Sequence, residues 1–342
     1  MTSLLLAFLV NPNQNSEVET LIRQFQSQNG VVGMTVAVYK DDKLSYHSEW
    51  GYQDREANKP TTRNTLIRLA SVSKPICAVG LMKQVELGKV NIDSDARPYL
   101  PGWPTEKPTF TLRQLMSHTS GFRHYLLGKD PNGKTAYATQ TRAAQLFMKD
   151  DLLHEPGTKY SYSTHAFTLV GAAVEKAAGT SYASYMRQTI FPFAGAGQLD
   201  CEIKSESKPN RSELYSAAKD AESTRDKVRE DISWKWGGGG LEATAIGLAK
   251  WGNDLMRDRI LKREIKEEMW KPTKLSNGSM SNYGLGFSLG KKGVASHSGA
   301  QQGSRTGFYI DHGHGIVVTV LCNTAGSYNP ETLAGKIAEI YE

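Results

Sequence analysis

The chain has 342 residues, of which 39% are hydrophobic and 22% are charged. This balance is typical of a folded protein with a large core, and it excludes a disordered chain, a collagen-like repeat and a membrane channel. The formal net charge of +6 comes from 41 basic and 35 acidic residues, but the two signs are mixed, as in residues 262–268, so we expect no nucleic-acid partner.

A run of seven apolar residues, 4–10, lies at the start. Seven residues is the lower limit for the core of a signal peptide, and neither a basic segment before it nor a small-residue cleavage site after it is present. The run is too short to span a bilayer, so we expect no stable membrane span. The compartment stays open: a periplasmic or extracellular location is slightly favoured over a cytoplasmic one, and a mitochondrial location is open for a eukaryotic source.

The first predicted elements are a helix and a hairpin. Ser16 and Glu19 form a capping-box pattern at the start of a helix that stops at Asn29-Gly30. Residues 32–39 and 44–50 are rich in β-branched and aromatic side chains and are joined through Asp41-Asp42, which predicts an antiparallel hairpin.

From about residue 71 to residue 240 the pattern predicts mostly helices and proline-marked or glycine-marked loops, with no β-rich stretch. Strand character returns at residues 283–289, 294–297, 306–310 and 315–321, and a final helix is predicted at 330–341. We therefore predict an α+β fold in one domain, 1–342. Residues 16–70 and 241–342 would form a sheet lobe and 71–240 a mostly helical lobe, with a cleft between them walled by loops 125–139 and 202–236.

The segment Ser71-Val72-Ser73-Lys74 begins an apolar helical run. Side chains three residues apart lie on one face of a helix, and a helix start offers free backbone N–H groups to a developing oxyanion. A serine hydroxyl needs a base to take its proton, and a buried lysine can have a pKa low enough to do so. The apolar neighbours of Lys74 predict that it is buried.

Two further segments could complete a site. Tyr162 follows a turn at Pro156-Gly157 and would serve as a general acid or base if cations lowered its pKa; by itself, its position favours a packing role at a helix entry. Ser296-His297-Ser298-Gly299-Ala300 is predicted as a strand whose edge could supply an oxyanion-hole N–H. His297 could act there as a cation, a hydrogen-bond donor or a proton carrier.

Other conspicuous residues have simpler explanations. The run Gly237 to Gly240 lacks the lysine of a phosphate loop and predicts tight backbone packing. His312 and His314 are expected in a turn, so no metal site and no cofactor are predicted, and His118 is expected to make a structural hydrogen bond. The three cysteines are far apart in sequence, and we expect neither a disulfide framework nor a nucleophile among them: Cys77, Cys201 and Cys322.

In this order and spacing, the three segments resemble the serine β-lactamase and penicillin-binding protein superfamily. The resemblance is closest to its class C-like branch, which includes DD-peptidases, esterases of β-lactamase fold, D-aminopeptidases and the mitochondrial β-lactamase-like protein. Further matching segments extend it over most of the chain from about residue 31: 67–70, 111–121, 238–241, 283–287 and 303–323.

The resemblance implies a β-lactamase/transpeptidase-like fold, in which helices flank an antiparallel sheet and a mostly helical lobe is inserted. It implies a serine hydrolase in which Ser71 attacks a carbonyl and is acylated, with Lys74 and Tyr162 moving the proton. The backbone N–H groups of Ser71 and Ala300 would form the oxyanion hole. The substrate would be a small molecule or a peptide.

Two positions depart from the motifs of the superfamily. Its Tyr-x-Asn is Tyr162-Ser163-Thr164 here, which puts a hydroxyl at a substrate-contacting position, and its Lys-Thr-Gly is His297-Ser298-Gly299, which removes a permanent charge. Both changes weaken the case for efficient β-lactam hydrolysis. A peptidase or amidase, an esterase or acyltransferase, and a low-turnover binding or filament-forming protein all stay open, as do the natural substrate and the oligomeric state.

Overall fold

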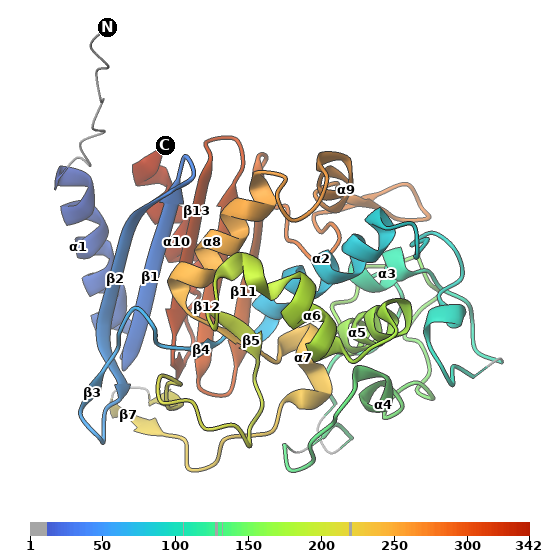
Figure 1. The fold of residues 1–342 in the computed structure, drawn as a ribbon, viewed down its shortest axis with the longest axis horizontal. Coiled ribbons are helices and arrows are strands. Elements are labelled where there is room, and N and C mark those ends of the chain that lie inside the picture. The colour runs from blue at the N-terminus through green and yellow to red at the C-terminus, as the bar shows by residue number, and fades with distance from the viewer. Residues whose placement is uncertain (1–11, 105, 127–128, 132, 219–220) are drawn as a thin grey trace, which may run out of the picture.

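The computed structural model describes residues 12–342 except 105, 127–128, 132 and 219–220. Its largest sheet has six antiparallel strands in the order β11-β12-β13-β1-β2-β3. The two ends of the chain build this one sheet, as predicted (Figure 1). Its strands are β1 (Gly33–Lys40), β2 (Lys43–Asp54), β3 (Lys59–Pro60), β11 (Val294–Gln301), β12 (Ser304–Asp311) and β13 (Ile316–Cys322).

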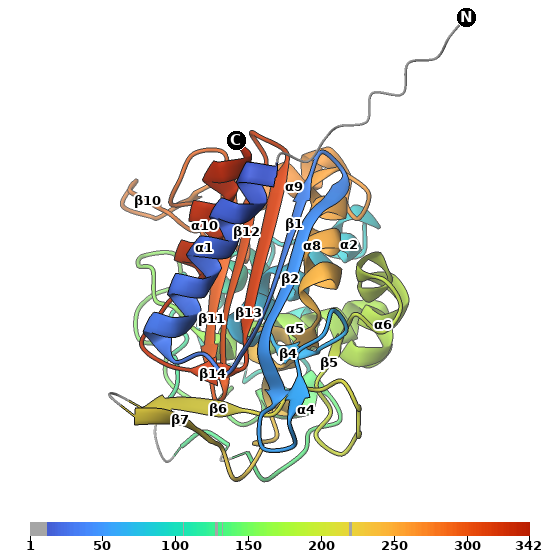
Figure 2. The same ribbon diagram turned by 90° about the vertical axis from the view of Figure 1, so that its left-hand side faces the viewer.

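Helices cover both faces of this sheet. Figure 2 shows α1 (Pro12–Asn29) and α10 (Pro330–Tyr341) on one face and α8 (Ala245–Met256) on the other. The central strands β1 and β13 pair Val36 with Val320, and every residue of β13 is buried. A strand covered on both faces needs apolar side chains at successive positions, which explains why β13 reads as a continuous apolar run.

A helical lobe packs beside the sheet (Figure 1). Its central helix α5 (Thr164–Ala178) is capped by the hydroxyl of Ser163, which accepts from the Ala166 N–H, and ends at Gly179 in a left-handed conformation. α2 (Ser73–Glu86) packs on α5. The remaining α-helices of the described residues are α3 (Leu112–Met116), α4 (Gln140–Ala144), α6 (Tyr182–Thr189), α7 (Trp236–Gly239) and α9 (Arg263–Met269).

Short strands interrupt the span predicted to be helical. Two of them, β6 (Tyr215–Ala218) and β7 (Ala221–Arg225), join β14 (Thr324–Ala325) in a small sheet, and β5 (Leu199–Cys201) pairs with β8 (Leu241–Ala243), which also pairs with β4 (Ile67–Arg68). The prediction of no β-rich stretch was wrong there, because strands of three to five residues are too short to show a periodic pattern.

Two other predictions need correction. Residues 283–289 make only isolated bridges and no strand, since Tyr283 and Ser288 bridge to each other and Ser288 bridges to Ser296. Ser16 lies inside α1, where its carbonyl accepts from the Thr20 hydroxyl, so it does not cap the helix. The remaining short pair is β9 (Thr273–Lys274) and β10 (Met280–Ser281).

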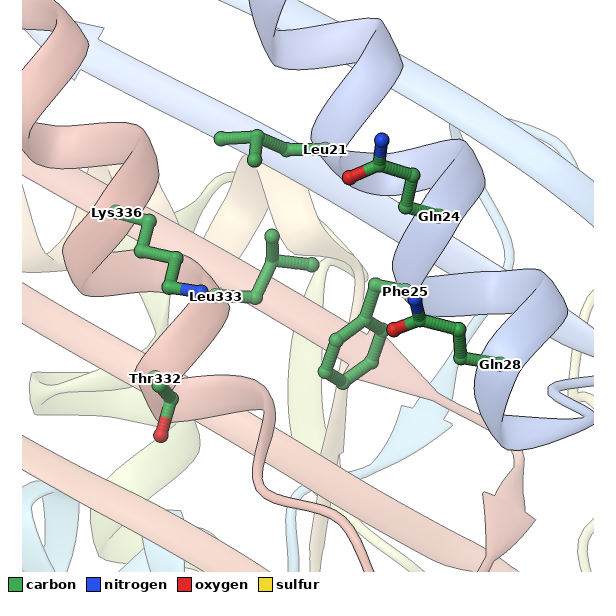
Figure 3. A pocket seen from close by; sticks show the side chains of 7 residues that line it. All are labelled: Leu21, Gln24, Phe25, Gln28, Thr332, Leu333 and Lys336. Carbon is green, nitrogen blue, oxygen red and sulfur yellow. The ribbon is translucent and has the colours of Figure 1, made fainter.

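The apolar run 4–10 lies outside the described residues. Within them, no helix has the length and apolar character needed to cross a bilayer. A small groove of about 100 Å³ lies between α1 and α10, with Phe25 and Leu333 at its floor and Gln24, Gln28 and Lys336 around it (Figure 3). Its apolar floor belongs to the contact that fixes α1 on the sheet.

Candidate active site

Ser71 lies in a single 3-10 turn, Ala70–Val72, between strand β4 and helix α2. The preceding residue, Ala70, has a φ of +49°. A left-handed conformation costs a residue with a Cβ about 1–2 kcal/mol, and strain of this kind gathers at functional sites. Ser71 is partly exposed, whereas Ala70 and Val72 on either side are buried. The turn therefore exposes one polar side chain at the end of a buried helix.

Lys74 lies one helical turn after Ser71 and is completely buried, with 0% of its surface exposed. Its Nζ is 3.0 Å from Ser71 Oγ, 2.7 Å from the Gly238 carbonyl oxygen and 3.2 Å from Thr164 Oγ1. No ion pair among the described residues involves this lysine. Burial, together with the charge of Lys235, holds the pKa of Lys74 well below its ordinary value.

The contacts of Lys74 fit a neutral amine. A neutral amine has two N–H groups and one lone pair, and the Gly238 carbonyl and Thr164 hydroxyl oxygens can accept the two hydrogens. The lone pair is then left for the hydroxyl hydrogen of Ser71 at 3.0 Å. This geometry allows Lys74 to take the proton of Ser71 directly.

Tyr162 also lies beside Ser71. Its hydroxyl interacts with that of Ser71, and Lys74 Nζ lies 4.8 Å from the centre of its ring. Burial raises the pKa of Tyr162 above its ordinary value. The condition stated for a general base, that cations lower this pKa, is therefore not met, because desolvation has the largest effect on it. A protonated phenol at this position can donate a proton but is a poor base.

Thr164 begins helix α5 and has no exposed surface. Its hydroxyl contacts Lys74, and its backbone N–H donates to His124 Nδ1 at 3.2 Å. A Cβ placed on Gly238 would come within 2.6 Å of the Thr164 methyl group, so the glycine run packs tightly against the start of α5. Thr164 therefore supports the lysine, and this position differs from the contact with a substrate that the motif predicts.

His297 is neutral in this site. Its Nδ1 lies 2.6 Å from the Ser298 carbonyl oxygen, which can only accept, so Nδ1 carries the hydrogen and Nε2 accepts from the Tyr283 hydroxyl at 2.9 Å. Burial and Lys74 lower the pKa of His297 to about 3. Both nitrogens are used within the protein, so the predicted cation or proton carrier is replaced by a fixed neutral imidazole.

Strand β11 presents its free edge to the nucleophile. Ser296 uses its backbone N–H and C=O to pair with Ser288, on the side away from β12. Backbone groups alternate along a strand, so those of Ser298 and Ala300 point to the same outer side. A Cβ on Gly299 would come within 2.4 Å of the Leu69 carbonyl oxygen, so only glycine lets β11 lie this close to the turn that holds Ser71.

A cleft of about 730 Å³ opens beside this edge. Both loops predicted to wall the cleft contribute to it, and Ala300 lies on its lining next to Gln301. The residues on the walls are Tyr125, Leu126, Asp130, Pro131, Glu230, Trp234, Lys235, Ala300, Gln301 and Gln302.

The sequence predicted the roles of some residues around the site and missed others. His118 makes the structural hydrogen bond predicted for it, because its Nδ1 accepts from the Ser163 N–H at 3.1 Å. The sequence did not indicate His124 or Lys235. The tight packing predicted for Gly237–Gly240 is confirmed, and it carries the Gly238 carbonyl to the lysine. The only signal in the sequence that could have indicated Lys235 is the glycine run that follows it, Gly237–Gly240.

The other candidate ligands and nucleophiles lie elsewhere. His312 stacks on Trp270 with ring centres 4.9 Å apart, and His314 binds the Asp311 carboxylate at 3.0 Å in the turn between β12 and β13. Atoms of Asp311, His314 and Glu342 lie within 4.8 Å of one another at the surface. The cysteines are unpaired and buried, and burial raises the pKa of each: Cys77, Cys201 and Cys322.

Comparison with known proteins agrees with this geometry. The family model described as Beta-lactamase matches residues 18–341, almost the whole chain. The chain belongs to the β-lactamase family. Penicillin-binding protein 4* of Bacillus subtilis is 29% identical over 322 residues, which cover 88% of this chain and 70% of that protein. The human mitochondrial serine β-lactamase-like protein LACTB is 24% identical, over 89% of this chain and 75% of that protein.

Solved structures support the same fold. The octameric penicillin-binding protein homologue of Pyrococcus abyssi is 23% identical with a TM-score of 0.78 and covers 94% of this chain and 75% of that one. The D-amino acid amidase of Ochrobactrum anthropi, in complex with D-phenylalanine, is 21% identical with a TM-score of 0.80 and covers 96% of this chain and 98% of that one. The β-lactamase/transpeptidase-like fold predicted from the motifs is therefore confirmed.

Proposed function

We propose that this member of the β-lactamase family is a serine hydrolase that cleaves amide or ester bonds through an acyl-enzyme formed on Ser71. One observation carries the proposal. The Nζ atom of a fully buried lysine lies 3.0 Å from the Ser71 hydroxyl, and its other two contacts, to Gly238 and Thr164, are with oxygen atoms that can accept its hydrogens.

The reaction follows from these contacts. Lys74 takes the hydroxyl proton as Ser71 Oγ attacks the substrate carbonyl carbon, and the carbonyl oxygen becomes an oxyanion. The N–H groups of Ser71 and Ala300 would stabilise it, each contributing about 3 kcal/mol to the transition state. The carbon–nitrogen or carbon–oxygen bond then breaks, and the leaving group receives a proton from Tyr162, which regains one from Lys74. Water releases the acyl group by the reverse proton path.

The neutral His297 bears on the choice of substrate. A carboxypeptidase substrate carries a carboxylate in its leaving group, and an uncharged imidazole with both nitrogens occupied offers it no cation. This supports amides and esters whose leaving group carries no charge next to His297, so an esterase or acyltransferase is the second candidate. Turnover of a nitrophenyl ester, a D-Ala-D-Ala peptide and a chromogenic cephalosporin would separate these classes.

Labelling with a fluorescent acylating probe tests the proposal. We expect the wild type to be labelled and Ser71→Ala to remain unlabelled. Ser73→Ala is the matched control, because Ser73 lies in the same segment but is buried and accepts from the Leu241 N–H, so this variant should still be labelled. Equal labelling of wild type and Ser71→Ala would refute the proposal. Stoichiometric labelling without turnover of any substrate would support the low-turnover binding protein instead.

A further inference from the structure

Lys235 lines the cleft together with the end of β11 and is 7% exposed. Its Nζ donates to the Tyr125 hydroxyl at 3.0 Å and lies 4.9 Å from the ring of Tyr125 and 5.4 Å from that of Trp234. Of the carboxylates that the structure describes, none lies within ion-pair distance of it. A buried cation without a counter-ion is costly, and aromatic rings compensate only in part.

Gln301 faces the same space from the end of β11. Neither its Oε1 nor its Nε2 has a hydrogen-bond partner among the described residues, although both atoms are buried. The two side chains meet at Gly239, where an added Cβ would lie 3.6 Å from Gln301 Oε1, 3.7 Å from Lys235 Cδ and 3.8 Å from the carbonyl carbon of Ala70. Unused hydrogen-bonding capacity and an unpaired cation therefore lie next to the residue before the nucleophile.

The acids of the cleft do not supply the missing partner. The Asp130 carboxylate is held by Arg123 at 3.0 Å and by His165 at 2.8 Å. Glu230 is exposed at the rim, where water screens its charge. The cleft thus holds the buried positive charge of Lys235. Of its two acids, Asp130 is already paired and Glu230 is solvated.

We propose that Lys235 and Gln301 bind an anionic group of the substrate, a carboxylate or a group of similar charge and size. This deepens the proposed function and rests on it. The charge that His297 does not provide on β11 is supplied by Lys235 at the end of the 3-10 helix Ser233–Lys235, so the anionic group lies in the cleft and not beside His297. Lys235 provides the charge, and the Gln301 amide provides a second hydrogen-bond donor.

Two pairs of esters test this inference. Mono-4-nitrophenyl glutarate against 4-nitrophenyl valerate places the carboxylate on the acyl side, and 3-carboxyphenyl acetate against phenyl acetate places it on the leaving side. The measured quantity is the ratio of kcat/KM between the two esters of each pair. If a substitution also disturbs Lys74 or the stability of the protein, it changes kcat/KM for both esters, and the ratio cancels that effect. Wild type, Lys235→Met, Lys235→Arg and Lys250→Met are compared.

We expect Lys235→Met to lower at least one ratio by about 10- to 100-fold, the effect of one charge-assisted hydrogen bond. The pair affected tells which side of the substrate carries the charge. Lys235→Arg should restore much of the ratio. Lys250→Met, which removes the same charge from the surface of α8, should leave both ratios unchanged. Ratios for Lys235→Met equal to those of the wild type in both pairs would overturn the inference.

Binding of glutarate, followed by saturation-transfer NMR, separates this inference from the proposed function. A wild type that hydrolyses neither esters nor amides through Ser71 refutes the proposed function alone. Glutarate that binds the wild type and not Lys235→Met then supports the anion site. Equal binding to both proteins, or no binding to the wild type, overturns it.

Discussion

At the scale of single residues, the base proposed for this site, Lys74, depends on burial without a counter-ion. Lys74 is enclosed between Gly238, Thr164 and the ring of Tyr162, and its amine meets only neutral groups. The same desolvation that lowers its pKa makes a proton on it costly in the folded protein. Catalytic competence and stability therefore oppose each other at this residue.

Replacement of Lys74 by methionine should separate the two effects. We expect acylation of Ser71 to fall by roughly 10²–10⁴-fold, since the general base is lost. The unfolded chain binds a proton on Lys74 below its ordinary pKa of 10.5, whereas the folded protein does not until its lowered pKa is reached. Wild type therefore loses about 1.4 kcal/mol of stability per unit as pH falls through that window, and the variant does not.

Urea unfolding of both proteins between pH 10 and pH 7 measures this difference. The variant should gain stability relative to the wild type as the pH is lowered. Lys250→Met is the control, because Lys250 is partly exposed on the surface of the fold and should show no such trend. A difference between Lys74→Met and wild type that does not change with pH would contradict a neutral lysine.

At the scale of elements, the site depends on the close approach of β11 to the turn that holds Ser71. The Thr306 hydroxyl on β12 donates to the Leu69 carbonyl at 2.8 Å, which fixes the sheet to the residues before the nucleophile. Gly299 lies between them, because a Cβ there would be 2.1 Å from the Thr306 hydroxyl oxygen and 2.4 Å from the Leu69 carbonyl oxygen. The Leu69 oxygen belongs to the backbone, so a side-chain rotation alone cannot relieve that contact.

Gly299→Ala should therefore push the strand edge away from Ser71. We expect a loss of stability of about 1–3 kcal/mol from overpacking and a fall in kcat that exceeds any change in KM, because the Ala300 N–H proposed for the oxyanion hole moves with the strand. Gly290→Ala is the matched control, since a Cβ at that position meets nothing within 4 Å. Thermal unfolding and ester kinetics check both variants, and wild-type kinetics in Gly299→Ala would contradict this account.

At the scale of the whole molecule, one buried ion pair connects the strand before the nucleophile to the cleft wall. Arg68 on β4 makes two hydrogen bonds of 2.7 Å to Glu202, and both side chains are almost completely buried. Arg68 also donates to the carbonyl of Glu230 and to the side chain of Gln302, two residues that line the cleft. Arg229 is a second partner of Glu202 at 3.0 Å.

Glu202→Gln should cost about 3–5 kcal/mol at pH 7, because it leaves the Arg68 charge buried without its counter-ion. The arginines lower the pKa of Glu202 to about 2, below its ordinary 4.5. The pair therefore stabilises the protein above pH 4.5 and loses this effect as pH falls toward 2. The difference in the free energy of unfolding between wild type and Glu202→Gln should therefore shrink as the pH falls from 4.5 toward 2. Urea unfolding of both proteins at pH 7 and below measures this difference, and a difference that does not change with pH would contradict the role of the ion pair.

The sequence predicts those features that depend on local pattern. The spacing of Ser71 and Lys74 places both on one face of a helix start, and the apolar runs of β1 and β13 predict a sheet shared by the two ends of the chain. Features that depend on distant segments were missed. The protonated state of Tyr162 and the neutral state of His297 follow from burial by several loops, and Lys235 enters the cleft only through folding of residues 230–236.

The central claim is that Ser71 carries the acyl group during turnover, and trapping that intermediate tests it most directly. A nitrophenyl ester is mixed with the wild type, the reaction is quenched in acid within the first turnover, and the protein is digested for peptide mass spectrometry. The account predicts the mass of one acyl group on the peptide that contains Ser71 and none in Ser71→Ala or Lys74→Met. An acyl group on any other residue, or turnover by Ser71→Ala at the wild-type rate, would contradict it.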